Sequence, residues 1–138
     1  MRPSQRYGLC ASLLACAAVC SGCATANTAG PVKLRSMQAR DFDTADKKKM
    51  LQAVIGTMQD LDFAIDKADY TLGTVTGSKY LGDAVAAMDV TVKPRGATQL
   101  LVWANAHYGA ASVKEAATYQ DFFVALEKAL FLTAQQVD

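Results

Sequence analysis

Residues 89–108 read DVTVKPRGATQLLVWANAHY, and this stretch decides the fold. Residues 89–93 alternate polar and apolar side chains, which is typical of a strand with one buried face. Residues 94–97 have the composition of a turn, and Gln99–Tyr108 returns as a longer strand candidate. The stretch therefore predicts two antiparallel strands joined by a short turn.

Alternation divides the second of these strands between two faces, because successive side chains of a strand point to opposite sides. One face carries Leu100, Val102, Ala104, Ala106 and Tyr108, and the other carries Leu101, Trp103, Asn105 and His107. The first face is the better core, and Val90 and Val92 join it. Trp103 then lies on a face without helices, unless the strand is shifted or both faces are covered, in which case Trp103 is core. An exposed tryptophan among polar residues is a typical docking anchor, so the second face is the candidate partner-docking surface.

Two segments have the apolar spacing of amphipathic helices. The first is expected to start at a cap on Asp43, with Asp46 in its first turn, and its stripe is Met50, Leu51, Val54, Ile55, Met58 and Leu61. The second is expected to start at Thr118 and ends near the C-terminus, with a stripe of Tyr119, Phe122, Phe123, Leu126 and Leu130.

The remaining segments complete the predicted order of elements. Residues 32–42 are predicted as a strand, residues 63–66 as a short strand before a turn at 67–69, and residues 70–80 as a further strand. Residues 81–88 suit either a helical turn or a loop, and residues 109–115 suit a loop. Strands grouped beside two helices predict an α+β domain, in which an antiparallel sheet of about four to five strands bears two amphipathic helices on one face.

The N-terminus has the order of an export signal. Arg2 and Arg6 precede an uncharged apolar run, and the run ends in Cys20-Ser21-Gly22-Cys23. This order resembles the bacterial lipoprotein signal. The resemblance implies cleavage between Gly22 and Cys23, followed by S-diacylation and N-acylation of Cys23. Cys16 is the fallback attachment site, and a membrane-spanning anchor or a cleaved signal without lipid are the competing readings.

The same resemblance bears on domain organisation and location. Residues 1–22 would be the signal peptide, residues 23–31 a lipidated tether of small polar residues, and residues 32–138 one periplasmic domain. In many Gram-negative lipoproteins an Asp after the lipidated cysteine causes retention at the inner membrane. Ala24 stands there in this chain, which favours the outer membrane, with the domain facing the periplasm.

A second resemblance concerns the region around the first helix. Residues 51–79 contain an amphipathic helix, a Leu-x-Phe strand, an acidic turn and a strand with glycine, and the matching residues are Leu61-Asp62-Phe63, Asp66, Asp69 and Gly73. This order resembles a repeated pattern in the family of the outer-membrane assembly lipoprotein BamC, with Asp62 where that family usually has glycine. The resemblance implies a helix-grip domain at the outer membrane.

Composition limits the chemistry. Fourteen basic against 13 acidic side chains give no nucleic-acid footprint, and all four cysteines lie at or before Cys23, so the domain has no disulfide. No motif indicates a metal or a cofactor. His107, the one histidine, suits a surface position better than a catalytic base. The acids Asp60, Asp62, Asp66 and Asp69 suit solvated turns better than a calcium site, and Lys47–Lys49 suit a solvated helix face better than a phosphate or headgroup patch.

These observations predict a binding or accessory module rather than an enzyme. The expected partners are membrane lipid, through the acylated N-terminus, and an envelope protein, with no nucleic acid. A carrier of a lipid or other apolar ligand is the alternative, and a small envelope enzyme is a weaker one. A carrier would need a cavity between sheet and helices, where the bulky Met50, Met58, Phe122 and Phe123 are expected to fill the space.

Overall fold

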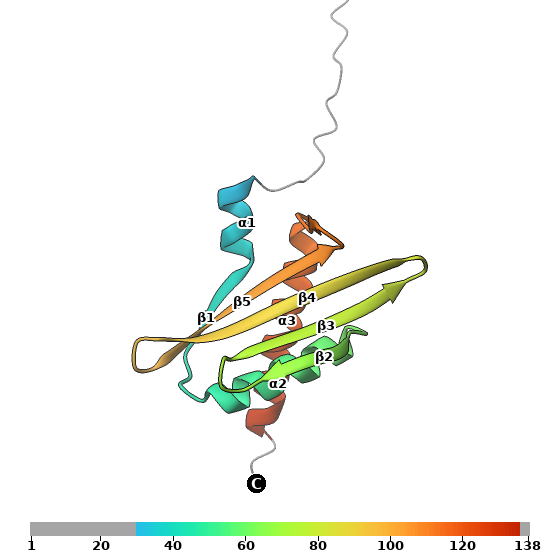
Figure 1. Cartoon of the computed structure of the whole chain (residues 1–138). Helices are drawn as coiled ribbons and strands as arrows, with labels where there is room; N and C mark the ends of the chain where they lie inside the picture. Colours follow the sequence, from blue (N-terminus) through green and yellow to red (C-terminus); the bar gives the residue numbers. More distant parts are fainter. Residues whose placement is uncertain (1–29, 136–138) are drawn as a thin grey trace, which may run out of the picture.

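The computed structural model describes residues 30–135 as an antiparallel sheet with helices (Figure 1). The strands are β1 (Ala39–Phe42), β2 (Ala64–Asp69), β3 (Thr74–Leu81), β4 (Ala84–Arg95), β5 (Gln99–Tyr108) and β6 (Ala111–Ser112). They pair in the order β1-β5-β4-β3-β2, and the short β6 pairs with β5. Cys16, Cys23 and the predicted signal peptide lie outside the described residues, as does most of the predicted tether.

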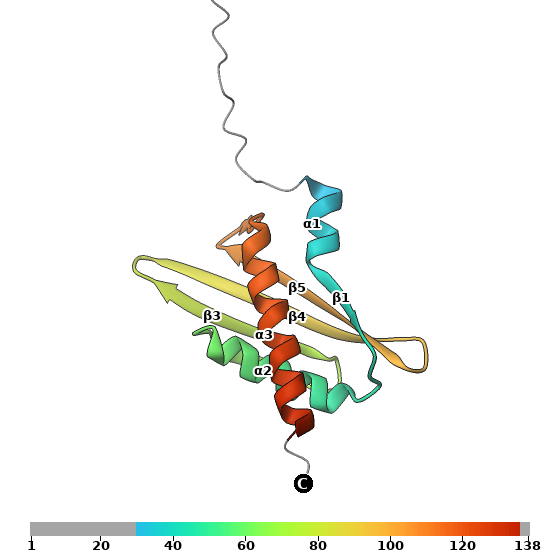
Figure 2. The ribbon, with the colours of Figure 1, turned by 180° about the vertical axis from the view of Figure 1, so that it is seen from behind.

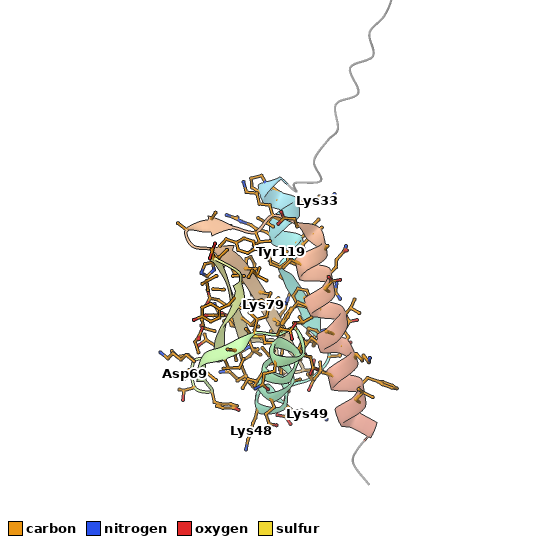
Figure 3. The ribbon with its side chains drawn as sticks, turned by 90° about the vertical axis from the view of Figure 1, so that its right-hand side faces the viewer. Lys33, Lys48, Lys49, Asp69, Lys79 and Tyr119 are labelled. Atoms are coloured by element: carbon orange, nitrogen blue, oxygen red, sulfur yellow. The ribbon has the colours of Figure 1, made fainter. Side chains whose placement is uncertain are left out.

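Three helices accompany the sheet: α1 (Pro31–Met37), α2 (Lys47–Asp60) and α3 (Ala116–Gln135). Figure 2 shows α2 and α3 lying together across one face of the sheet, and Figure 3 shows the opposite face without a helix. The predicted α+β class, with an antiparallel sheet and two amphipathic helices on one face, is confirmed. Within residues 30–135, no helix has the length and apolarity needed to cross a membrane.

The register of β4 and β5 follows the alternation in their sequences. Val90 pairs with Ala104 and Val92 pairs with Val102, and all four side chains are buried under the helices. The two predicted strands are therefore confirmed. Their turn lies slightly later than expected, because the strand continues to Arg95 and Gly96 then takes a φ of +68°, which glycine adopts without strain.

The core lies between this sheet face and the two helices. The buried side chains of the helix stripes are Met50, Leu51, Val54, Met58, Tyr119, Phe122, Phe123 and Leu126. Both predicted stripes are thus confirmed in their centres, whereas Ile55 and Leu130 at their margins are only partly buried. Phe122 and Phe123 meet edge to face with ring centroids 5.2 Å apart, a favourable aromatic geometry.

The predicted strand over residues 32–42 is wrong in its first half. Pro31 opens the helix α1, and only residues 39–42 form a strand. Proline suits the first helical position because it has no N–H to donate there. The partial alternation of the sequence also fits a helix, since Leu34 and Met37 are three residues apart and both pack on the core.

Both long helices start at residues other than the predicted caps. Asp46, not Asp43, caps α2, and its Oδ1 accepts a hydrogen bond of 2.9 Å from the backbone N–H of Lys49. Helix α3 already begins at Ala116, before the predicted cap Thr118.

Residues 81–88, which the sequence left as a helical turn or a loop, form a tight turn and the start of a strand. Gly82 turns the chain with a φ of +64°, and β4 then starts at Ala84. Ala86 and Met88 are buried on the helix side of the sheet, and residues 84–88 pair with residues 77–81 of β3. Similarly, β2 extends through the predicted turn at residues 67–69, and β3 starts only at Thr74.

The outer edge strand β2 is irregular. Its pairing with β3 shifts register between Ile65 and Lys67, which leaves Asp66 as the extra residue of a bulge. The strand also carries Lys67 and Asp69.

Helix α2 ends in a Schellman motif at Asp62. The N–H of Phe63 donates to the carbonyl of Met58 at 2.9 Å, and the N–H of Asp62 donates to that of Gln59 at 3.0 Å. Asp62 has a φ of +66°, in the left-handed region that favours glycine. The Lys79 ammonium donates to the carbonyl of Leu61 at 3.0 Å, where the helix dipole favours a cation.

Candidate docking face

The face of the sheet away from α2 and α3 is here named the open face. It consists of the side chains that alternate with the core residues along the strands. Its central members are Leu101, Trp103, Asn105 and His107 on β5, Asp89, Thr91, Lys93 and Arg95 on β4, and Thr76 and Ser78 on β3. All four predicted docking residues therefore share one surface.

Trp103 lies outside the core, with 37% of its surface exposed. Its cross-strand neighbours are Ala39 on β1 and Thr91 on β4, both too small to cover an indole. Thr91, Lys93, Leu101 and Trp103 line a shallow depression of about 230 Å³. The depression offers an apolar wall beside one ammonium group.

One ion pair and one hydrogen bond lie near the β4–β5 turn, at one end of the open face. Arg95 Nη1 lies 2.5 Å from Asp41 Oδ2, and Gln99 Nε2 donates to Asp43 Oδ1 at 2.6 Å. Arg95 and Asp41 remain partly exposed to water, so these groups form a polar rim at that end of the open face.

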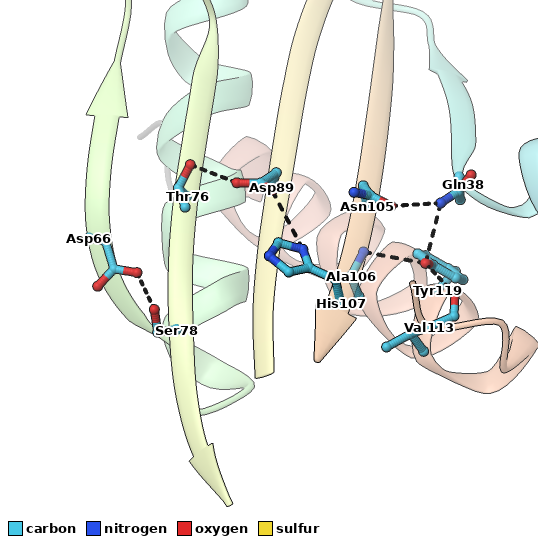
Figure 4. Close-up of polar contacts among 10 residues, drawn as sticks. All are labelled: Gln38, Asp66, Thr76, Ser78, Asp89, Asn105, Ala106, His107, Val113 and Tyr119. Atoms are coloured by element: carbon cyan, nitrogen blue, oxygen red, sulfur yellow. Dashed lines mark hydrogen bonds and ion pairs between the residues drawn. The ribbon is translucent and has the colours of Figure 1, made fainter. Parts of the chain in front are cut away.

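A second polar chain crosses β3, β4 and β5 on the other side of Trp103 (Figure 4). Thr76 Oγ1 donates to Asp89 Oδ1 at 2.9 Å, and His107 Nδ1 lies 3.7 Å from Asp89 Oδ2. In a hydroxyl–imidazole–carboxylate triad the imidazole lies between the other two groups, whereas here the carboxylate of Asp89 lies between Thr76 and His107. The order of these three side chains is therefore not that of such a triad.

Asn105 is partly committed to the interior. Its Oδ1 accepts a hydrogen bond of 3.1 Å from Nε2 of Gln38, which is itself buried. Gln38 lies between α1 and β1, and its carbonyl accepts from the N–H of Ala104 at 2.7 Å. Asn105 thus joins the open face to the start of the sheet and contributes less free surface than Trp103.

Tyr119 completes this interior network, which the sequence analysis did not predict. Its hydroxyl donates to the carbonyl of Val113 at 2.8 Å and accepts from the N–H of Ala106 at 3.3 Å. Gln38 Nε2 lies 3.3 Å from the same oxygen. The hydroxyl fills the gap on the β5 edge between β1 and β6, where a ladder partner is missing. The only signal in the sequence is a tyrosine within an apolar helix stripe, since a buried hydroxyl needs partners.

Asp62, Asp66 and Asp69, three of the four acids around the predicted turn, each contact a different residue. Asp62 pairs with Lys79 at 3.4 Å, Asp66 accepts from Ser78, and Asp69 Oδ1 accepts from the N–H of Leu72 at 2.8 Å. Among residues 30–135, no three His, Cys, Asp or Glu side chains are grouped closely enough to hold a metal ion.

The predicted Lys47–Lys49 run likewise lies at the surface, where Lys47 Nζ donates to the carbonyl of Thr71 at 3.0 Å. This contact fastens α2 to the turn between β2 and β3. Gly73 in that turn has a φ of +76°, and an added Cβ there would lie 2.4 Å from the carbonyl of Val92.

One hollow lies on the helix side of the sheet, between the end of α2 and the start of α3. Its volume is about 220 Å³, and its apolar lining includes Leu61, Phe63, Leu81, Met88, Tyr108 and Val113. Met50, Met58, Phe122 and Phe123 fill the space further along the helices, as expected. Tyr108, expected in the core, is half-exposed here because neither helix extends over it.

No protein-family model matches the chain, and no curated protein matches it at a significant level. The function is therefore argued from the residues and their geometry.

Proposed function

We propose that the chain is a lipoprotein of the bacterial outer membrane, whose domain faces the periplasm and binds an envelope protein through the open face. The Cys20-Ser21-Gly22-Cys23 order supports acylation at Cys23, and Ala24 supports the outer membrane. The observation that carries the binding role is Trp103, exposed at the centre of a sheet face that no described helix covers.

The chemistry around Trp103 favours a protein partner. An indole with Leu101 beside it offers a compact apolar anchor, and the ion pair between Arg95 and Asp41 gives it a neutral, wet rim. Protein interfaces have this composition, with an aromatic anchor at the centre and polar groups around it. A nucleic-acid surface would instead need a basic stripe.

The docking role is tested by a pull-down from detergent-solubilised membranes with the native lipid attached. Trp103→Ala should abolish most of the partner's recovery, corresponding to about 2 kcal/mol or more of association free energy. Leu72→Ala is the matched control, since Leu72 is also exposed but lies in the turn between β2 and β3. Equal recovery with both variants would remove the open face as the docking surface.

The anchor is tested separately by labelling with a fatty-acid precursor. Cys23→Ser should abolish incorporation, because diacylglycerol transfer needs a thiolate that serine cannot supply at neutral pH. Incorporation that survives Cys23→Ser but is lost in Cys16→Ser would move the attachment site to Cys16.

A second candidate function is a carrier of a small apolar ligand, and the hollow between α2 and α3 favours it. Ala86 lies at the floor of that hollow, so Ala86→Phe should fill it. Mass spectrometry of the purified chain under native conditions would then show a bound lipid in the parent and none in the variant. Absence of any ligand in the parent would count against the carrier.

A further inference from the structure

The first helix, α1, exposes an apolar side chain between two cations. Val32 is 85% exposed, and Lys33 and Arg35 are exposed as well. Leu34 and Met37 pack on the core, so the helix turns Val32 away from the domain, with the two cations flanking it. An apolar side chain in this setting can enter a lipid headgroup layer while the neighbouring cations contact phosphates.

The charges of this segment match an anionic surface. Residues 24–40 contain Lys33, Arg35 and Arg40 but no acid. Arg40 pairs with Glu127 at 2.6 Å, whereas neither Lys33 nor Arg35 forms an ion pair in the part of the chain that the structure describes. The charges of Lys33 and Arg35 are therefore available to anionic lipids, which stabilise each cation near their surface.

Other exposed groups lie at the same end of the molecule. Figure 1 shows α1 at one end, together with the turn between β5 and β6 and the start of α3. Strand β5 ends there with the half-exposed Tyr108, and tyrosine rings favour the boundary between lipid and water. Lys114 and Glu115 precede α3 and cancel in net charge, so the surplus positive charge at this end comes from α1.

The connection to the acyl anchor favours a lipid bilayer as the occupant of this surface. The inference rests here on the proposed acylation of Cys23. Residues 24–30 separate Cys23 from α1, and seven residues span at most about 25 Å. Acyl chains in the bilayer would hold α1 near the headgroups at a high effective concentration, so that a weak attraction is enough for contact.

We propose that this end of the domain lies on an anionic bilayer surface, with Lys33 and Arg35 on lipid phosphates and Val32 in the headgroup layer. Helix α3 lies along one face of the sheet and leads away from this end (Figure 2). Both faces of the sheet therefore stand upright on the membrane. Trp103 then faces sideways, where a protein in the same membrane can reach it.

Quenching by brominated lipid tests the contact in the full acylated chain. Val32→Trp, combined with Trp103→Phe to remove the natural indole, is reconstituted in vesicles of phosphatidylcholine and phosphatidylglycerol. The emission should lose more than half of its intensity when the acyl chains are brominated. Val124→Trp in the same background is the matched control, because Val124 is 61% exposed on the outward side of α3, and its emission should change little.

Removal of the cations tests the electrostatic part of the contact. Lys33→Gln with Arg35→Gln should weaken it about thirtyfold, at about fivefold for each cation near an anionic surface, and the quenching should be lost. Lys48→Gln with Lys49→Gln removes the same charge at the opposite end of the molecule (Figure 3) and should leave the quenching unchanged. Vesicles of phosphatidylcholine alone should quench little.

The outcomes separate the contact from the anchor. An acylated chain whose indole at position 32 is quenched no more than the indole at position 124 would overturn the membrane contact and leave the anchor standing. Equal quenching in the two charge variants would overturn the role of Lys33 and Arg35. A chain that takes up no fatty-acid label would overturn the anchor, and the contact with it.

Discussion

The two faces of the sheet share the same strands and the same backbone, yet the consecutive residues Val102 and Trp103 differ in burial. Val102 is fully buried beneath the helices, and the next residue in the chain reaches water on the other side. On one face the side chains are held by close packing, and on the other by hydrogen bonds and ion pairs such as that of Asp89 with Thr76. The effect of a substitution on stability therefore depends on the face to which the side chain points, and consecutive residues point to opposite faces.

The largest expected effect lies in the packed layer. Phe122→Ala should cost about 3 to 5 kcal/mol of unfolding free energy, because a fully buried ring leaves a cavity that the core cannot close. Urea unfolding measures it. A loss below about 1 kcal/mol would mean that the helix layer is not the stabilising one.

A smaller loss is expected from the polar network at the edge of that layer. Tyr119→Phe keeps the ring but removes the hydroxyl, so the N–H of Ala106 and the carbonyl of Val113 lose their partner. The expected cost is about 1 to 3 kcal/mol. Tyr80→Phe, at an exposed tyrosine, should change the unfolding free energy by less than about 0.5 kcal/mol.

Replacing threonine by valine should change the unfolding free energy in opposite directions in the helix layer and on the open face. Thr57 is fully buried in α2, and its hydroxyl has no hydrogen-bond partner among the described residues, so Thr57→Val should stabilise by up to about 1 kcal/mol. Thr76→Val on the open face removes the hydrogen bond to Asp89 and should destabilise by about 0.5 to 1 kcal/mol. Thermal unfolding of both variants side by side checks this, and equal signs would contradict the contrast.

A small effect on stability is also expected at Trp103. Trp103→Ala should change the unfolding free energy by less than about 1 kcal/mol, since no cavity forms in the core. Trp103 is the only tryptophan, so its fluorescence reports the site directly. A red-shifted emission that acrylamide quenches readily is expected, and a blue-shifted, protected emission would place the indole in an interface or a core.

The sequence predicted the secondary structure and the buried face correctly where one apolar periodicity extended over many residues. Alternation in β5 predicted both faces correctly except at Tyr108, and the stripes of α2 and α3 predicted the helix layer. The sequence did not decide the structure of short segments. In residues 32–42, for example, partial strand alternation occurs together with the helical spacing of Leu34 and Met37. Residues 84–88 have no pattern that distinguishes a strand from a helix. Their alanines are small enough for a strand that packs beneath a helix, and alanine also favours helices.

The interior network shows a different limit. Gln38 and Tyr119 are 81 positions apart, and no local pattern relates a glutamine near the first strand to a tyrosine in the last helix. Their contact follows from the missing ladder partner on β5, which exists only after the sheet is assembled. The anchor at Cys23 remains a prediction from the N-terminal residues.

The bulge in β2 has a consequence for behaviour at high protein concentration. A straight edge strand can pair with the edge of a neighbouring molecule and start an extended, irreversible sheet. Here the bulged Asp66 and the charges of Lys67 and Asp69 interrupt the row of backbone donors and acceptors along the outer edge. Copies at high local concentration would therefore resist aggregation through β2.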